Sequence, residues 1–228
     1  MEKLQGIFWY GDFDNYFLGH QFAEILKDRI YAPYLENIKN ATVIDVGANL
    51  GAFSLYASKY AKQVYAIEPA LIHFNAITEM LKFNGITNVK LIKKAIFIEN
   101  KEFPLFHNPN RTMYSLHTAV DAKQEPPEKV QAITLDQLFD DEKIEHCHLL
   151  KADIEGSEYE LFAGQGFSKV ATKIDVVVTE RHEWGGRNKN QLDEAFKLNN
   201  FEVKTIPSDA DIVVAVNKNA NKTVLNLQ

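Results

Sequence analysis

The chain has 228 residues, of which 46% are hydrophobic, and its 25 basic and 31 acidic side chains give a net charge of −6. This length and composition can fill one sizeable core, so we expect a single main domain. The acidic balance and the lack of a Lys/Arg-rich cluster argue against a general nucleic-acid binder, and no DNA partner is expected. The single cysteine, Cys147, excludes an intramolecular disulfide and a cysteine-based zinc cluster. No apolar run resembles a secretion signal or a membrane span, which predicts a cytoplasmic protein without a membrane partner.

Residues 1–40 are expected to form an N-terminal aromatic helical arm, and residues 41–228 the main domain. Aromatic side chains are dense between residues 7 and 19, and apolar residues follow at near-helical spacing until Pro33 interrupts them. An arm of this kind packs on a domain by its aromatic face. The same pattern also suits a lid over an active site or the contact of a homodimer, and the sequence does not separate these interpretations.

The segment VIDVGANLG, residues 43–51, predicts a strand followed by a glycine-rich turn. Its apolar start is typical of a buried parallel strand. Gly47 and Gly51 have no Cβ, so the backbone can turn sharply there and approach a ligand closely. An amphipathic helix over residues 52–61 is expected next, with its N-terminal N–H groups facing whatever lies above the strand.

The residues of this turn favour one cofactor over another. A dinucleotide-binding turn needs the pattern G-x-G-x-x-G, and Asn49 stands where the second glycine should be. Asp45 would lie near the doubly anionic pyrophosphate of a dinucleotide, whereas a carboxylate suits a ligand that carries an ammonium and a sulfonium. The turn therefore favours S-adenosylmethionine, and a tight turn without a ligand is the alternative.

A second strand over residues 63–67 is predicted to deliver an acid to the same site. It ends at Glu68 and Pro69, and Glu68 falls 21 positions after Gly47. An acid near that offset, at the end of the second strand, can accept hydrogen bonds from both hydroxyls of a ribose.

A third strand is expected over residues 88–97, with Lys94 and Ala95 near its carboxyl end, where an adenine edge could lie. Residues 101–129 then break the pattern with turn-forming and proline-rich sequence. Long connections without structure of their own are uncommon unless they are functional. We therefore interpret this region as a loop or hairpin insertion near the active face.

The end of the chain decides the topology. Parallel strands are expected over residues 147–152 and 174–179, followed by a helix over 188–198. Two further strands, 201–206 and 211–216, are joined by only four residues. A parallel crossover needs a dozen residues or more, so these strands must be antiparallel neighbours. The predicted fold is a doubly wound, mostly parallel seven-stranded α/β sheet that ends in an antiparallel hairpin, as in Rossmann-like class I methyltransferases.

Several motifs occur together over roughly residues 42–182: VIDVGANLGAFSLYAS, VYAIEPALIHF, NGITNVKLIKKAI, ITLDQLF, LLKADIEGSEYELFAG and VVVTERH. In their content and order they resemble the FkbM-like family of S-adenosylmethionine-dependent methyltransferases. The pairing of D-V-G-A-N-x-G with K-x-D-x-E-G-x-E carries most of the specificity. Lys93 and Lys94 depart from the family, where smaller polar residues are more usual.

The resemblance implies O-methylation of a hydroxyl on a small molecule or saccharide. It also implies that Asp45, Gly47, Asn49 and Gly51 hold the methionine end of the cofactor, that Glu68 holds the ribose, and that Asp153 lies beside the sulfonium. With their neighbours, the predicted cofactor-binding residues are Asp45, Gly47, Ala48, Asn49, Gly51, Glu68, Pro69, Lys94, Ala95 and Asp153.

Transfer to a hydroxyl needs a group that removes its proton, and three strand-end residues are candidates. His182 is the first choice, ahead of Asp153 and Glu155, although it could also be a surface or capping histidine. Glu155 and Glu158 could instead anchor their loop to backbone N–H groups. The predicted substrate contacts are Tyr114, Ser115, His117 and Glu180.

A metal site and a nucleobase N-methylation site are alternatives to this one. Asp153, Glu155, Glu180 and His182 could converge as an oxygen-rich Mg²⁺ site, but no spacing demands it and no metal is predicted. N-methylation of a nucleobase commonly uses an Asn/Asp-Pro-Pro-aromatic turn, which is absent after the fourth strand. The alternative functions are an RNA- or protein-directed methyltransferase of the same fold and a non-catalytic nucleotide-binding protein.

Overall fold

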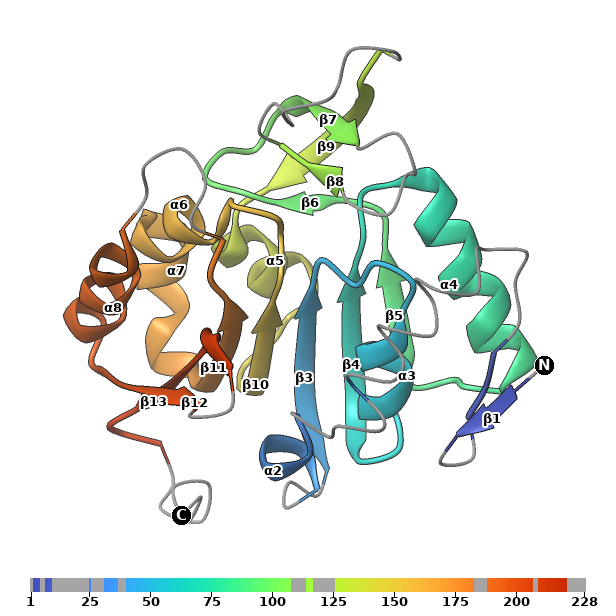
Figure 1. The fold of residues 1–228 in the computed structure, drawn as a ribbon, viewed down its shortest axis with the longest axis horizontal. Helices are drawn as coiled ribbons and strands as arrows, with labels where there is room; N and C mark the ends of the chain where they lie inside the picture. Colours follow the sequence, from blue (N-terminus) through green and yellow to red (C-terminus); the bar gives the residue numbers. More distant parts are fainter. Residues whose placement is uncertain are drawn as a thin grey trace.

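The computed structural model describes residues 2–4, 7–9, 25, 31–36, 40–107, 114–116, 126–182, 188–206 and 209–220. Its centre is a seven-stranded sheet with the strand order β12-β13-β11-β10-β3-β4-β5 (Figure 1). The strands are β3 (Ala41–Val46), β4 (Ala61–Ile67), β5 (Val89–Ile92), β10 (Cys147–Ala152), β11 (Ile174–Glu180), β12 (Phe201–Ile206) and β13 (Asp209–Asn217).

The pairing confirms the predicted fold class. The strands β3, β4, β5, β10 and β11 are parallel, whereas β13 runs antiparallel to both β11 and β12. The short connection between β12 and β13 leaves no room for a crossover, which is why the sheet ends in a hairpin.

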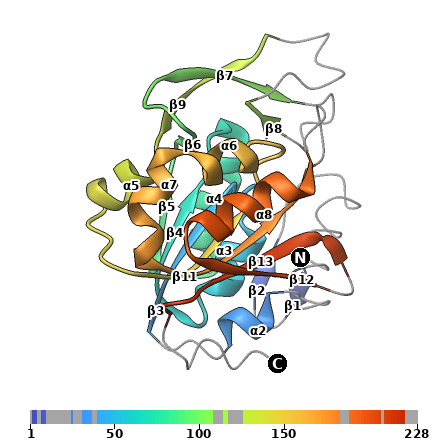
Figure 2. The same ribbon diagram turned by 90° about the vertical axis from the view of Figure 1, so that its left-hand side faces the viewer.

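Helices cover both faces of the sheet. They are α2 (Ala32–Leu35), α3 (Ala52–Ala57), α4 (Leu71–Phe83), α5 (Leu135–Asp141), α6 (Glu158–Ala163), α7 (Gln165–Val170) and α8 (Lys189–Leu198), with a short 3₁₀ turn, η2 (Ala171–Lys173). Val43 packs in the cluster formed with α2, α3 and α4, and the next residue, Ile44, packs in the cluster formed with α5 to α8. Figure 2 shows α6, α7 and α8 grouped together on their side of the sheet. Burial on both faces explains the continuous apolar runs of the parallel strands.

A second, four-stranded sheet lies beyond the carboxyl ends of β3 and β4 (Figure 1). Its strands are β6 (Ala95–Ile96), β7 (Glu102–His107), β8 (Tyr114–Ser115) and β9 (Glu128–Ile133), in the order β6-β9-β7-β8. The single strand expected over residues 88–97 is therefore divided. Its first part, β5, completes the main sheet, and its second part, β6, pairs with β9.

The N-terminal region is described only in part. A hairpin of β1 (Glu2–Leu4) and β2 (Ile7–Trp9) lies beside α4, where the sequence predicted helix, and most of the predicted arm falls outside the described residues (Figure 1). Within the described part of the chain, no helix is both long and apolar enough to cross a membrane.

Candidate active site

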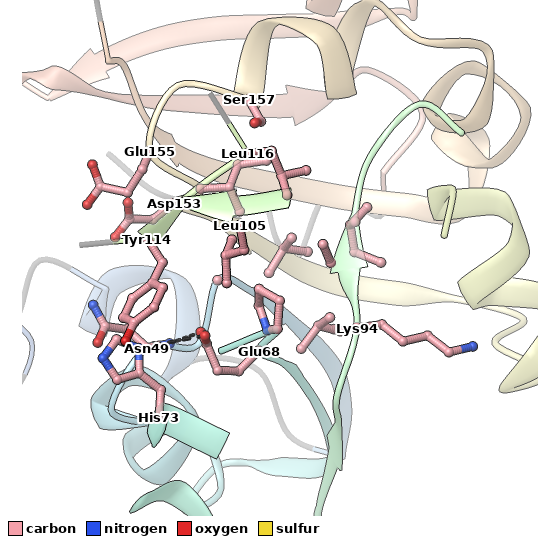
Figure 3. Close-up of a pocket in the computed structure, with 17 residues that line it drawn as sticks. Asn49, Glu68, His73, Lys94, Leu105, Tyr114, Leu116, Asp153, Glu155 and Ser157 are labelled. Carbon is pink, nitrogen blue, oxygen red and sulfur yellow. Dashed lines mark hydrogen bonds and ion pairs between the residues drawn. The ribbon is translucent and has the colours of Figure 1, made fainter. Parts of the chain in front are cut away.

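A pocket with an empty volume of about 580 Å³ lies at the carboxyl ends of β3, β4 and β10, beneath the second sheet (Figure 3). Its apolar wall consists of Val46, Ile67, Pro69, Ala95, Ile96, Leu105, Leu116 and Ile154. Its other lining residues are Gly47, Asn49, Glu68, His73, Lys94, Tyr114, Asp153, Glu155 and Ser157. Mostly apolar walls with a few convergent polar groups are typical of small-molecule sites.

The glycine-rich turn is held by close packing of the backbone. Gly47, Asn49 and Gly51 all have a positive φ, at 75°, 51° and 84°. The N–H of Gly47 donates a hydrogen bond to the carbonyl of Ile67 at 3.0 Å. A Cβ at position 47 would lie 1.9 Å from the carbonyl oxygen of Asp153. Glycine is therefore required at this position by the neighbouring chain, in addition to any approach of a ligand.

Glu68 lies in the wall of the pocket in a fixed orientation. Its Oε2 accepts a hydrogen bond from the N–H of Asn49 at 2.8 Å (Figure 3), and its Oε1 accepts one from the N–H of Ala70 at 2.9 Å. His73 Nδ1 lies 3.6 Å from the same Oε1. Because a carboxylate oxygen can accept two hydrogen bonds, Glu68 retains acceptor capacity for ribose hydroxyls.

Asp45 lies beneath the turn and outside the lining of the pocket, although the sequence placed it near the cofactor. Its Oδ2 accepts a hydrogen bond from Ser54 Oγ at 2.6 Å, and its Oδ1 lies 3.4 Å from Lys151 Nζ. Burial raises the pKa of Asp45, and the charge of Lys151 opposes that rise. The carboxylate of Asp45 therefore interacts with Ser54 and Lys151 of the protein itself and does not face the pocket.

Lys151 connects the glycine-rich turn with Asp45 and Asp153, a role that was not predicted from the sequence. Its Nζ donates a hydrogen bond to the carbonyl of Gly47 at 2.9 Å and lies 3.6 Å from Asp153 Oδ2. Burial lowers its pKa, but the charges of Asp45 and Asp153 outweigh burial and raise it, so the ammonium stays charged. The available signal was a lysine at the buried carboxyl end of a mostly apolar strand.

A cluster of acidic side chains surrounds His182 at the ends of β10 and β11. His182 Nδ1 lies 3.1 Å from Glu158 Oε1. His182 Nε2 lies 3.5 Å from Glu155 Oε2, 3.8 Å from Glu180 Oε1 and 3.9 Å from Asp153 Oδ1. The structure thus brings together the four strand-end residues that the sequence suggested could converge, but only Asp153 and Glu155 of the four line the main pocket.

Glu158 fixes the loop that follows β10. Its carboxylate is fully buried and accepts hydrogen bonds from the N–H of Ile154 at 2.7 Å and of Gly156 at 2.9 Å. Glu158 thus anchors the loop through backbone N–H groups, which is one of the roles that the sequence left open for it. Ser157, the residue before α6, makes no side-chain capping hydrogen bond within the described chain. The N–H groups of Ile154 and Gly156 donate to the carboxylate of Glu158 instead.

The protonation states of Glu155 and His182 decide which of them can act as the general base. Burial, followed by the charge of Asp153, raises the pKa of Glu155 to about 8. Burial lowers the pKa of His182, but the hydrogen bond with Glu158 and the nearby carboxylates outweigh it and raise the value to about 10. An imidazole that already holds its proton at neutral pH cannot take another, so this arrangement argues against His182 as the general base.

The predicted substrate contacts lie in different surroundings. Tyr114 lines the pocket, and its ring centroid lies 4.7 Å from that of His73. Ser115 is buried and donates a hydrogen bond from Oγ to the carbonyl of Glu155 at 2.8 Å, so it holds the loop. His117 lies outside the described residues. Glu180 lines a second cavity and does not line the main pocket.

The second cavity adjoins the first. It has an empty volume of about 420 Å³ and is lined by Ile25, Tyr31, Ala48, Asn49, Ala52, Phe53, Lys151, Asp153 and Glu180. Asn49 and Asp153 line both cavities and therefore stand between them. Of the remaining predicted cofactor residues, Ala48 faces this cavity, and Gly51 begins α3 without lining either cavity.

The side chain of Lys94 departs from its predicted place in the cofactor site. Pro69 and Ala95 line the apolar wall as expected. Lys94 also lies at the wall, but its side chain points away from the pocket (Figure 3), and its Nζ lies 3.5 Å from Asp141 Oδ2. Its backbone is therefore the part that remains available to a ligand.

A mostly parallel sheet with a final antiparallel hairpin, and a ligand-sized pocket at the strand ends, define the class of Rossmann-like methyltransferase folds. The family model for the methyltransferase FkbM domain matches residues 45–203, which is more than half of the chain. The chain belongs to the FkbM methyltransferase family, as the sequence motifs predicted.

Individual relatives are more distant. The chain is 26% identical to methyltransferase sdnD of Sordaria araneosa over 175 residues, which cover 63% of this chain and 67% of that protein. It is 35% identical to protein arginine N-methyltransferase 1 of Oryza sativa over 102 residues, which cover 41% of this chain but only 26% of that protein. The chain thus spans about two thirds of the first relative and a quarter of the second.

Two solved structures share the fold. One is the methyltransferase FkbM of Methylobacillus flagellatus KT, with a TM-score of 0.50 and 14% identity over 89% of this chain and 55% of that chain. The other is a conserved hypothetical protein of Streptococcus pyogenes, with a TM-score of 0.52 and 13% identity over 85% of this chain and 96% of that chain. At these identities the likeness concerns the fold alone.

Proposed function

We propose that the chain is an S-adenosylmethionine-dependent methyltransferase whose acceptor is a hydroxyl group on a small molecule or saccharide. The observation that best supports this proposal is the position of Glu68, a buried carboxylate held in the pocket wall by the N–H groups of Asn49 and Ala70. An acid at this strand end suits the two hydroxyls of a ribose. The acidic surroundings of the pocket suit a cationic cofactor better than the diphosphate of a dinucleotide.

The chain's own residues fit such a cofactor. The apolar wall beside Ala95 would receive the adenine ring, and Glu68 would receive the ribose hydroxyls. Asn49 Oδ1 is a buried acceptor with no hydrogen-bond donor among the described residues, and it borders both cavities. An ammonium group placed in the second cavity would satisfy it. When bound, the cofactor supplies a methyl group on a positively charged sulfur.

The residues around Asp153 would then face the acceptor. Asp153 borders both cavities, and Glu155 and Tyr114 line the main pocket beside it. With a pKa near 8, Glu155 could accept a hydroxyl proton once it is ionised, since a general base works best when its pKa is close to the working pH. We therefore assign the proton-accepting role to Glu155, with Asp153 as its neighbour in the site.

Calorimetric titration with S-adenosylhomocysteine and with NAD tests the cofactor assignment. We expect S-adenosylhomocysteine to bind and NAD not to bind. Glu68→Gln should weaken S-adenosylhomocysteine roughly ten- to hundredfold, because a charge-assisted hydrogen bond contributes about 1.5–3 kcal/mol. Glu142→Gln, at a carboxylate outside the pocket, is the matched control. Micromolar binding of NAD without any response to S-adenosylhomocysteine would refute the proposal.

A second candidate is a protein- or RNA-directed methyltransferase. The partial match to an arginine methyltransferase favours the protein-directed form, and so do the carboxylates around His182, which suit a cationic acceptor such as an arginine side chain. Mass spectrometry of small-molecule, peptide and RNA acceptors after incubation with the cofactor separates these candidates. Methylation confined to arginine peptides or to RNA would replace the hydroxyl acceptor proposed above.

A further inference from the structure

Three side chains at the ends of β10 and β11 have the types and spacing of a metal-binding set. Asp153, Glu155 and His182 each offer one ligand atom, and these atoms all lie within 4.8 Å of one another. A single ion can contact three atoms at such separations. Two carboxylates with one imidazole suit Mg²⁺, Mn²⁺ or another hard to borderline divalent cation.

Glu158 orients the imidazole in the manner seen at metal centres. It lies at 3.1 Å from His182 Nδ1, and its own carboxylate is fixed by two backbone N–H groups. A histidine that binds a metal almost always donates its other N–H to a carboxylate, which sets the tautomer and the direction of the ligating nitrogen. Here that arrangement directs His182 Nε2 toward Asp153 and Glu155, and an ion bound there would displace the proton that Nε2 holds in the free chain.

A second observation concerns the carboxylate of Glu155, whose Oε2 lies 3.5 Å from His182 Nε2. Glu155 Oε2 is buried and accepts no hydrogen bond from any residue that the structure describes. A buried carboxylate oxygen without a donor is costly unless a positive charge satisfies it. Glu180 Oε1 lies 3.8 Å from His182 Nε2 and adds a further acid at the same place. The carboxylates thus outnumber the one imidazole that they surround.

We propose that Asp153, Glu155 and His182 bind a divalent cation at the edge of the main pocket. From the sequence this convergence was a possible Mg²⁺ site, but no metal was predicted, because no spacing of the ligands demands one; the parallel pairing of β10 with β11 brings the ligands together. The catalytic role of the ion, though not its binding, rests on the proposed function. When bound, the ion would hold Glu155 as a ligand in place of the free base assigned above, and the ion itself would position an acceptor hydroxyl and lower its pKa, as Lewis-acidic ions do.

A second set, His146, His148 and Asp175, also has three ligand atoms within 4.8 Å of one another, but it suits an ion less well. His148 Nδ1 accepts a hydrogen bond from the N–H of Thr42 at 3.1 Å, so a neutral His148 carries its proton on Nε2. His146 Nε2 already lies 3.0 Å from Asp175 Oδ1. This set therefore serves as the comparison site.

Electron paramagnetic resonance of Mn²⁺ titrated into the metal-free full chain tests the proposal, because protein-bound Mn²⁺ lowers the signal of the free ion. We expect one Mn²⁺ per chain, displaced by excess Mg²⁺. Glu155→Gln and His182→Ala should each weaken Mn²⁺ at least about tenfold, and Glu158→Gln about 10–100-fold, as for other residues that orient a ligand. Circular dichroism of each variant verifies that it is folded.

Two controls locate the ion, and one measurement separates this proposal from the proposed function. His146→Ala and Glu142→Gln should leave Mn²⁺ affinity unchanged. Loss of Mn²⁺ in His146→Ala alone, or the absence of Mn²⁺ binding by the wild-type chain, overturns the proposal. Calorimetry with S-adenosylhomocysteine is run on the same samples. Binding of that ligand without Mn²⁺ rejects only the ion site, and binding of Mn²⁺ without that ligand rejects only the cofactor.

Discussion

The carbonyl oxygen of Asp153 lies 1.9 Å from the point where a Cβ would stand on Gly47. The two residues come from the ends of the adjacent strands β3 and β10, and the N–H of Asp153 also donates a hydrogen bond to the carbonyl of Val46 at 3.1 Å. The glycine-rich turn after β3 and the loop after β10 are therefore packed directly against each other.

Gly47→Ala tests this packing. A non-glycine residue at a positive φ costs about 1–3 kcal/mol, and the contact with a backbone oxygen adds to that cost. Gly85 provides a matched control, because its φ is 64° and a Cβ there would meet nothing within 4 Å. We expect Gly85→Ala to lose only about 1–2 kcal/mol in urea unfolding, and Gly47→Ala to lose more and also to weaken S-adenosylhomocysteine. Equal losses in the two variants would show that backbone strain alone matters.

Lys151→Met should be strongly destabilising. It leaves the buried carboxylate of Asp45 without its cation and the carbonyl of Gly47 without its donor. Removing one partner of a buried pair costs about 3–5 kcal/mol. The double variant Asp45→Asn with Lys151→Met should be more stable than Lys151→Met alone, because no uncompensated charge remains. Urea unfolding followed by circular dichroism measures both, and additive losses would argue against a coupled pair.

Ser115→Ala distinguishes a structural from a substrate-binding role. If Ser115 Oγ serves to hold the carbonyl of Glu155, its loss should cost about 1–3 kcal/mol of stability. Ser168→Ala is the control, since that exposed hydroxyl lies within its own helix and should change stability by less than about 0.5 kcal/mol. A weaker acceptor affinity with unchanged stability would restore the contact predicted from the sequence.

His148 predicts a dependence of stability on pH. Burial, followed by the positive charge of His146, lowers the pKa of His148 below its usual value of 6.5. The unfolded chain therefore takes up a proton more readily than the folded chain as the pH falls through 6.5, and the free energy of unfolding decreases. His148→Asn keeps an acceptor for the N–H of Thr42 and cannot titrate. We expect a smaller loss of stability between pH 7.5 and 5.5 in this variant, measured by urea unfolding at each pH.

The elements that were predicted best are those whose pattern is local. Cys147–Ala152 is predicted as a mostly apolar strand and forms β10 with the same bounds. The final hairpin followed from a short connection, which is a geometric limit that no tertiary contact can override. The division of the third strand was missed, because the partner of Ala95–Ile96 is β9, more than thirty residues further along the chain.

The site was harder to predict than the fold, since burial and side-chain direction depend on tertiary contacts. Asp45 looks like a strand-end ligand in the sequence, but its side chain is sealed beneath the turn by Lys151 and Ser54. His182 and Asp153 were expected together because the carboxyl ends of parallel strands share one edge of the sheet. The raised pKa of His182 could not be predicted from the sequence, because it depends on how many carboxylates surround the ring in the folded chain.

The strand order has a consequence for how the chain folds during synthesis. β13 lies between β11 and β12, so β12 is made first but has no partner in the main sheet until residues 209–217 follow. Until then β11, which leads into Arg181 and His182, also presents an open edge, and Arg181 lacks the carbonyl of Asp211 that its N–H reaches in the finished fold. Open strand edges invite pairing with other chains. A nascent chain can therefore assemble the half of the site around Glu68 before the half around His182, which is completed only when β13 inserts.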